Sequence, residues 1–100
     1  MDQHYIDGSR LVTRRSARDQ IHLAWNYECA YCGDPLGRSP TLDHVIPKVH
    51  GGLTVRENLV SCCLSCNSRK GHLAWIDWYR QQHFWAPERE WAIAQWLHQQ

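Results

Sequence analysis

Residues 1–12 show no clear periodicity of apolar positions, which predicts a loose arm or a short strand. The first regular pattern of apolar positions follows this stretch. Ser16 and Asp19 are spaced like the start of a capping box, so a helix is predicted from Ser16 onwards. We expect this helix to end before Cys29, where a tight turn begins. Its apolar positions are Ile21, Leu23, Ala24 and Trp25.

The middle of the chain predicts two short strands separated by an exposed loop. Residues 41–46 read as a short strand, and Pro47 ends it because proline cannot donate a hydrogen bond to a neighbouring strand. Residues 48–57 contain two consecutive glycines and predict a loop on the surface. Residues 58–61 predict the second strand.

The rest of the chain predicts helices. A short helix begins near Ser65 or Asn67 and ends around Gly71, because glycine suits the backbone conformation that often follows a helix. The tail, residues 73–100, has two more apolar sets at helical spacing, and Pro87 suits the first turn of the second set. The two sets are Trp75, Ile76 and Tyr79, followed by Trp91, Ala94 and Leu97.

The tail is also unusually rich in tryptophan. Aromatic residues at helical spacing usually belong to the core, which we expect for most of these side chains. Stacking of a single tryptophan on a base or a sugar is the alternative. The tryptophans of the tail are Trp75, Trp78, Trp85, Trp91 and Trp96.

The size of the chain favours one small domain, residues 1–100, with a core at about 25–72 and a helical tail. In a domain of this size the hydrophobic core is thin, and a metal site adds stability. No apolar run approaches the roughly 18 to 20 residues of a membrane span, and the first residues lack a signal-peptide pattern. We therefore expect a cytoplasmic protein without a membrane partner.

The net charge of +1 gives little global attraction to nucleic acid. Any contact with nucleic acid must therefore come from local groups of basic residues. One such group precedes the first cysteine pair, and a solvated surface is an equally good interpretation of it. Its members are Arg14, Arg15 and Arg18.

The cysteines predict a structural zinc site. Cys29 with Cys32 and Cys63 with Cys66 form two C-x-x-C pairs, and two such pairs can occupy the four corners of a tetrahedral zinc site. Cys62 is less well spaced and is expected to be a small buried residue. A redox role for the first pair is disfavoured, since the strand-helix-strand pattern around a thioredoxin-type motif is absent.

A second group of polar residues near the predicted strands suits phosphodiester hydrolysis. A neutral imidazole such as that of His44 takes a proton from water near neutral pH with little tuning. Cations such as Mg²⁺ prefer oxygen ligands, which the Asp43 carboxylate and the Asn67 amide supply. Asp43 and His44 can serve one reaction only at a strand end, because neighbouring residues on a strand point to opposite faces. Asn58 can tie the long loop back to the strand.

The motifs D-H-x-I-P, G-G, E-N-L and C-x-x-C-N-x-x-K-G stand in order over about residues 25–72 and resemble those of the HNH endonuclease family. The resemblance implies an α+β fold with a small ββα-metal (His-Me finger) core, a structural zinc site and flanking N- and C-terminal helices. It also implies that His44 is the general base, that Asp43 and Asn67 hold one catalytic Mg²⁺ or Mn²⁺, and that Asn58 braces the loop. Asn67 stands where the third residue of the H-N-H signature is usually a histidine, so the chain is similar to an H-N-N variant.

The resemblance further implies a DNA endonuclease that acts on double-stranded DNA, as a monomer that nicks or as a homodimer that cuts both strands. Nucleases of this size that resemble the chain occur in phages and mobile elements. His50 and His72 are expected at the surface rather than in the site. The expected nucleic-acid contacts are Lys48, Arg56, Arg69 and Lys70.

A zinc-stabilised nucleic-acid-binding module without catalysis is the alternative from another class of function. The cysteine pairs and the basic residues alone would permit it. It leaves the second group of polar residues unexplained, because binding requires none of them. A preference for RNA or branched DNA is also compatible with these residues.

Overall fold

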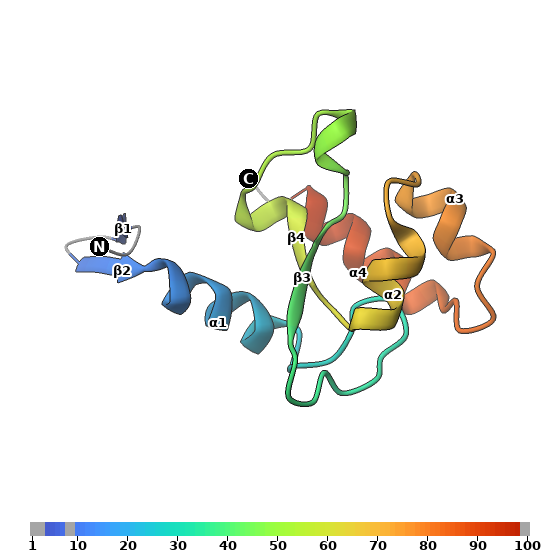
Figure 1. The fold of residues 1–100 in the computed structure, drawn as a ribbon, viewed down its shortest axis with the longest axis horizontal. Coiled ribbons are helices and arrows are strands. Elements are labelled where there is room, and N and C mark those ends of the chain that lie inside the picture. The colour runs from blue at the N-terminus through green and yellow to red at the C-terminus, as the bar shows by residue number, and fades with distance from the viewer. Residues whose placement is uncertain (1–3, 8–9, 99–100) are drawn as a thin grey trace.

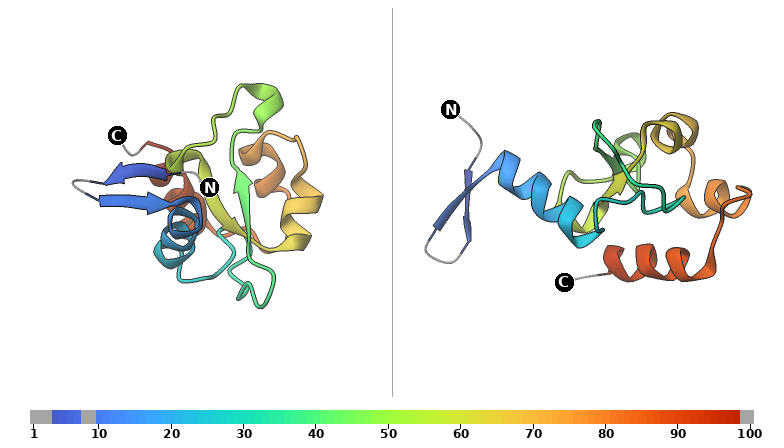
Figure 2. Two further views of the ribbon diagram at one scale, coloured as in Figure 1. Left: turned by 60° about the vertical axis from the view of Figure 1, so that its left-hand side comes forward. Right: turned by 90° about the horizontal axis from the view of Figure 1, so that it is seen from below.

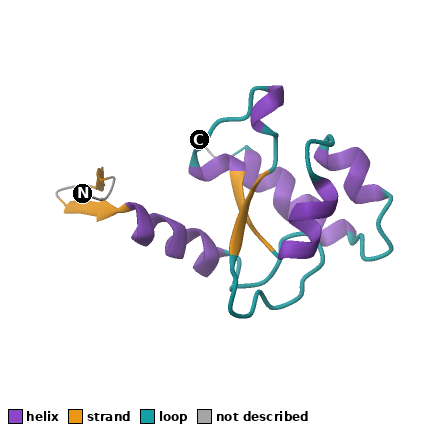
Figure 3. Cartoon of the chain, in the orientation of Figure 1, coloured by secondary structure: helices purple, strands orange, loops and turns teal. Residues whose placement is uncertain are grey.

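A computed structural model of the protein describes residues 4–7 and 10–98, whose arrangement is shown in Figures 1 and 3. The strands and helices are β1 (His4–Asp7), β2 (Arg10–Thr13), α1 (Arg14–Ala24), β3 (Thr41–His44), β4 (Leu59–Cys62), α2 (Leu64–Lys70), α3 (Trp75–Arg80) and α4 (Pro87–Leu97). Two short 3-10 helices in the loop between β3 and β4 are η1 (Lys48–His50) and η2 (Arg56–Asn58).

The N-terminal part is an antiparallel hairpin of β1 and β2 that continues directly into α1. The hairpin and the start of α1 extend away from the other elements, whereas the end of α1 reaches the strands (Figure 1). The predicted capping box is wrong, since α1 begins at Arg14 and Ser16 lies inside it. The helix ends where Asn26 and Tyr27 adopt left-handed backbone angles, with φ of 57° and 53°. This change of direction brings the chain to the first cysteine pair.

The centre of the fold is the antiparallel pair of β3 and β4, in which Asp43 lies opposite Val60 and His44 opposite Leu59. The helix α2 packs against β3, while α1 packs against β4 (Figure 2). The predicted strand-loop-strand-helix order is present, with shifted bounds. β3 ends two residues before Ile46, and Asn58 belongs to η2 rather than to β4.

The tail forms α3 and α4, and it contributes the buried side chains of Trp78, Tyr79 and Ile93 to the core. The expectation of mostly buried tryptophans holds only in part. Trp91 is 66% exposed and Trp85 39% exposed. The apolar side of α4 is centred on Ile93, and Trp91 lies two residues away on a different face of the helix. Within the described residues, no helix is long and apolar enough to cross a membrane.

Candidate metal centre and active site

The four cysteines of the two C-x-x-C pairs come together in one cluster. The Sγ atoms of Cys29, Cys32, Cys63 and Cys66 all lie within 4.8 Å of one another. The first pair sits on the turn after α1, closed by a hydrogen bond of 2.9 Å from the Gly33 N–H to the Cys29 carbonyl. Four sulfur ligands at these separations fit a closed tetrahedral zinc site.

The second cysteine pair belongs to the start of α2. Cys63 is the N-cap residue, and its Sγ accepts a hydrogen bond of 3.4 Å from the Cys66 N–H. Cys62 is fully buried at the end of β4 and is not a member of the cluster. The four clustered cysteines therefore belong to the turn after α1 and to the start of α2.

Asp43 and His44 are the last two residues of β3, and their side chains have different partners. Asp43 is buried, and its Oδ2 accepts a hydrogen bond of 2.6 Å from the Tyr31 hydroxyl. His44 is half-buried, and its Nε2 lies 2.9 Å from the Thr54 Oγ1 in the β3–β4 loop. Both residues are therefore placed at the strand end, as the predicted chemistry requires.

The pKa values of the two side chains shift in opposite directions. Burial raises the pKa of Asp43, although the Lys70 ammonium and the Tyr31 hydroxyl act against this shift. Burial and the nearby charge of Lys48 lower the pKa of His44. The imidazole is consequently favoured in its neutral form, which is the form able to accept a proton.

Lys70 has a different environment from the one expected of a phosphate contact. It is fully buried, its Nζ lies 3.1 Å from the Asp43 Oδ2, and it donates a hydrogen bond of 3.0 Å to the His44 carbonyl. A buried ammonium with these partners cannot reach a phosphate at the surface without leaving a buried carboxylate unpaired. The predicted nucleic-acid contact at Lys70 is therefore corrected to a structural pairing with Asp43.

Asn67 follows Cys66 of the cysteine cluster on α2 and faces β3. Its Nδ2 lies 3.2 Å from the Thr41 Oγ1 and 3.4 Å from the Leu42 carbonyl. Because these contacts occupy the amide nitrogen, the carbonyl oxygen is the atom left for a ligand. Asn67 and Asp43 thus belong to the two elements that pack against each other at this site.

Asn58 connects both ends of the β3–β4 loop. Its Oδ1 accepts a hydrogen bond of 2.9 Å from the Ile46 N–H, and its Nδ2 donates to the carbonyls of Ile46 and Leu53 at 3.0 and 2.9 Å. Gly52 lies against this bonded group, since a Cβ there would be 1.7 Å from the Ile46 carbonyl oxygen. These contacts are the ones that a brace for the loop requires.

The remaining basic residues of the predicted interface are exposed. Lys48 and Arg69 face solvent, and the Arg56 guanidinium lies 4.7 Å from the centre of the Trp96 ring. Among the described residues, His50 makes no hydrogen bond with a side chain of the site. Its Nε2 lies 2.9 Å from the His72 carbonyl. Arg18 is also exposed. The side chains of Arg14 and Arg15 lie outside the described part of the structure.

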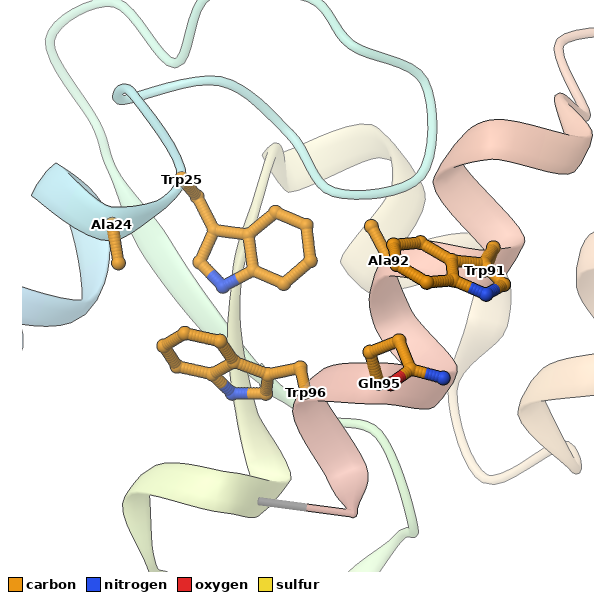
Figure 4. A pocket seen from close by; sticks show the side chains of 6 residues that line it. All are labelled: Ala24, Trp25, Trp91, Ala92, Gln95 and Trp96. Carbon is orange, nitrogen blue, oxygen red and sulfur yellow. The ribbon is translucent and has the colours of Figure 1, made fainter.

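A tryptophan-lined cleft of about 360 Å³ lies between the end of α1 and α4 (Figure 4). Trp25 and Trp96 meet edge to face across it, with ring centres 5.4 Å apart. The indole nitrogen of Trp25 points toward Trp96, and Trp91 lines the cleft farther along α4 (Figure 4). Its residues come from other elements than Asp43, His44 and Asn67, so the cleft is not part of the candidate active site.

Sequence reasoning missed two partners of Asp43, namely Tyr31 and Lys70. Tyr31 lies inside the first C-x-x-C pair, and Lys70 stands three residues after Asn67 on the same helix. The only available signal was their position within motifs. A polar residue inside a metal-binding turn has its direction fixed by the ligands on either side, which favours a specific contact.

The pair of strands, the helix α2, the Asp43-His44 strand end and the adjacent four-sulfur cluster define a zinc-stabilised ββα-metal fold. Residues 29–73 match the model of the HNH endonuclease family. This central part of the chain is therefore similar to the HNH endonuclease domain.

A curated relative agrees with this assignment. Over 55 residues the chain is 44% identical to a CRISPR-associated endonuclease Cas9 of Corynebacterium diphtheriae. The matched segment is 53% of this chain but only 5% of the length of that relative. The likeness thus concerns one segment of a much longer protein.

Proposed function

We propose that the protein is a metal-dependent DNA endonuclease that hydrolyses phosphodiester bonds. The observation that carries the proposal is the end of β3, where a half-buried imidazole of lowered pKa follows a buried, partnered carboxylate. Asp43 and His44 occupy this position within the segment that matches the HNH family. A binding module has no use for this arrangement.

In the proposed reaction His44 acts as the general base. Its Nε2 lies 2.9 Å from the Thr54 Oγ1, and in the tautomer that carries the proton on Nε2 the Nδ1 lone pair accepts a proton from water. The resulting hydroxide attacks phosphorus in line, the bond from phosphorus to the 3′ oxygen breaks, and that oxygen leaves with a proton from solvent. The products carry 5′-phosphate and 3′-hydroxyl ends.

Asp43 and Asn67 would hold the catalytic cation, Mg²⁺ or Mn²⁺. Bound there, such an ion supplies charge neutralisation at the scissile phosphate and at the departing oxygen. The residues fit a hard cation, because both offer oxygen. A carboxylate has about four lone-pair sites. Hydrogen bonds from Tyr31 to Oδ2 and from Lys70 to Oδ1 use two of those on Asp43, which leaves lone pairs for an ion.

Double-stranded DNA is the substrate that we propose, with phosphate contacts from Lys48, Arg56 and Arg69. All three are exposed and lie in or near the β3–β4 loop and α2. One such site cuts one strand, so the protein nicks as a monomer or cuts both strands as a homodimer. An origin in a phage or mobile element and a reducing cytoplasmic location complete the proposal, since the cluster needs reduced thiols.

A nicking assay on supercoiled plasmid with Mg²⁺ or Mn²⁺ tests the proposal. We expect the wild-type protein to nick and His44→Ala to be slower by about 10²- to 10⁴-fold, the usual contribution of a general base. His50→Ala is the matched control, because it removes an exposed histidine of the loop that follows His44. Equal nicking by His44→Ala and wild type, or no nicking with either cation, would favour the silent binding module.

A further inference from the structure

The tyrosine inside the first C-x-x-C pair contacts the candidate active site. The Tyr31 hydroxyl donates a hydrogen bond of 2.6 Å to the Asp43 Oδ2. Tyr31 is fully buried and Asp43 is 5% exposed, so water does not compete for this bond. The contact joins a turn that carries two zinc ligands to the strand end that carries the proposed cation ligand.

The position of Tyr31 is set by groups other than Asp43. Its carbonyl accepts a hydrogen bond of 2.6 Å from the Tyr79 hydroxyl on α3. Its ring contacts Trp78 and Tyr79 edge to face, with ring centres 5.1 and 5.5 Å apart. The preceding residue, Ala30, donates a hydrogen bond of 2.8 Å to the Ser61 carbonyl of β4. These contacts hold the phenol in place independently of its hydrogen bond to the Asp43 carboxylate.

We propose that Tyr31 is a positioning residue that orients the Asp43 carboxylate for the catalytic cation. A carboxylate that binds an ion must be held in one direction, and hydrogen bonds to ligands commonly provide this. The hydrogen bond from Tyr31 to Oδ2 fixes the direction in which the remaining lone pairs of Asp43 point. This inference rests on the proposed function, since it assigns the cation to Asp43.

The arrangement also links the two metal sites. Tyr31 lies between Cys29 and Cys32, so the shape of the zinc-bound turn determines where the phenol oxygen lies. Lys70 also contacts Asp43, but its ammonium sits at the end of a flexible stem on another element. A rigid aromatic ring with a single donor restricts the carboxylate more closely than such a stem.

The test is Tyr31→Phe, which keeps the ring and removes only the hydroxyl. In the zinc-loaded protein without DNA, we expect Mn²⁺ to bind about 10- to 100-fold more weakly, the usual effect of losing a partner of a metal ligand. Electron paramagnetic resonance of free Mn²⁺ measures this affinity independently of cleavage. Tyr27→Phe is the matched control, because its hydroxyl makes a surface contact of 3.3 Å with Asp19.

A double-mutant comparison separates positioning from general support of the fold. If Tyr31 acts through Asp43, then Tyr31→Phe has no further effect on Mn²⁺ binding in an Asp43→Asn background. An equal effect in both backgrounds would overturn the proposal. So would loss of zinc from Tyr31→Phe, because the hydroxyl would then support the zinc-binding turn rather than the carboxylate.

The two proposals fail in different ways. Wild-type protein that binds Mn²⁺ with the expected dependence on Tyr31, yet never nicks DNA, would overturn the nuclease assignment and leave the positioning role intact. Wild-type protein that nicks DNA, while Tyr31→Phe binds Mn²⁺ as tightly as wild type, would overturn the positioning role alone.

Discussion

Asp43 and His44 are neighbours in the sequence, yet burial raises the pKa of Asp43 and lowers the pKa of His44. Side chains alternate along a strand, so Asp43 turns to Tyr31 and Lys70 in the core while His44 turns to Thr54 in the loop. Burial favours the neutral form of each side chain. For His44 this form is the proton acceptor, whereas for Asp43 the ammonium of Lys70 favours the carboxylate. The opposite surroundings therefore suit the two proposed roles.

At the residue scale, we predict that acid weakens the fold partly through His22. His22 is buried, with its Nδ1 2.6 Å from the Ser61 Oγ. Burial, and to a lesser degree the charge of Arg18, lowers its pKa from the ordinary value of 6.5. The unfolded chain thus binds the proton more readily. The stabilisation is fully present above about pH 6.5 and is lost as the pH falls through the folded-state pKa.

The measurement is the free energy of unfolding of the zinc-loaded protein in urea, between about pH 7 and pH 5. His22→Gln should lose stability less steeply than wild type over this range. His83→Gln, at an exposed position, should follow wild type. Protonation of the zinc-binding thiolates affects all three proteins alike, so parallel curves for His22→Gln and wild type would contradict the prediction.

The buried partners of Asp43 show where residue-level prediction from sequence ends. His44, Asp43 and the cysteines were predicted because each belongs to a short motif with a chemical requirement. Lys70 was expected at the surface, since lysine is almost never fully buried unless it is paired. Its pairing arises from the packing of α2 against β3, which the order of residues does not reveal.

At the scale of elements, the loop between β3 and β4 depends on one buried asparagine. At the end of the loop, Asn58 binds the N–H and the carbonyl of Ile46 near the start of the loop and the carbonyl of Leu53 in its middle. It also ends η2, so that β4 begins at Leu59. The loop carries Thr54, the partner of His44, and its shape therefore affects the proposed base.

Replacing Asn58 with alanine should loosen this loop. The change leaves the backbone groups of Ile46 and Leu53 without their partner, at a cost of about 1–3 kcal/mol for a buried group. We expect a lower free energy of unfolding and faster proteolysis within the loop. Glu57→Ala is the control, because the Glu57 side chain makes no hydrogen bond or ion pair among the described residues. Equal proteolysis of the two variants would contradict the assignment of Asn58 as the brace.

The order of the elements could be predicted more securely than their bounds. Pro47 and the two glycines after it indicated the end of β3 and the loop, and both features are present. The start of α2 was placed too late, because the cap of this helix is a cysteine rather than one of the usual polar residues. The apolar side of α4 was predicted to include Trp91, Ala94 and Leu97, whereas the buried residue of this helix is Ile93.

At the scale of the whole molecule, the cysteine cluster joins segments that are distant in the sequence. It fixes the turn after α1 to the start of α2, and through Tyr31 and Asn67 it adjoins both proposed cation ligands. In a domain of this size, apolar burial alone gives only a small net free energy of folding. Zinc binding in such small domains contributes directly to the free energy of folding.

Zinc removal should therefore abolish cleavage even with Mg²⁺ in excess. Without the ion, nothing holds the four thiols together, and the first turn of α2 is no longer fixed to the turn after α1. Asn67 lies on this helix and moves with it. Chelation of zinc should change the near-ultraviolet circular dichroism of the buried aromatic residues and stop plasmid nicking, and added zinc should restore both signals.

Two cysteine variants distinguish loss of zinc from loss of a buried side chain. Cys63→Ala removes a ligand, so we expect a zinc content well below one ion per chain and no nicking. Cys62→Ala removes the neighbouring, fully buried cysteine that is outside the cluster, so zinc and nicking should persist with some loss of stability. Full cleavage by a folded, zinc-free Cys63→Ala protein would show that the two sites are independent, because Asn67 would then hold its position without the sulfur cluster.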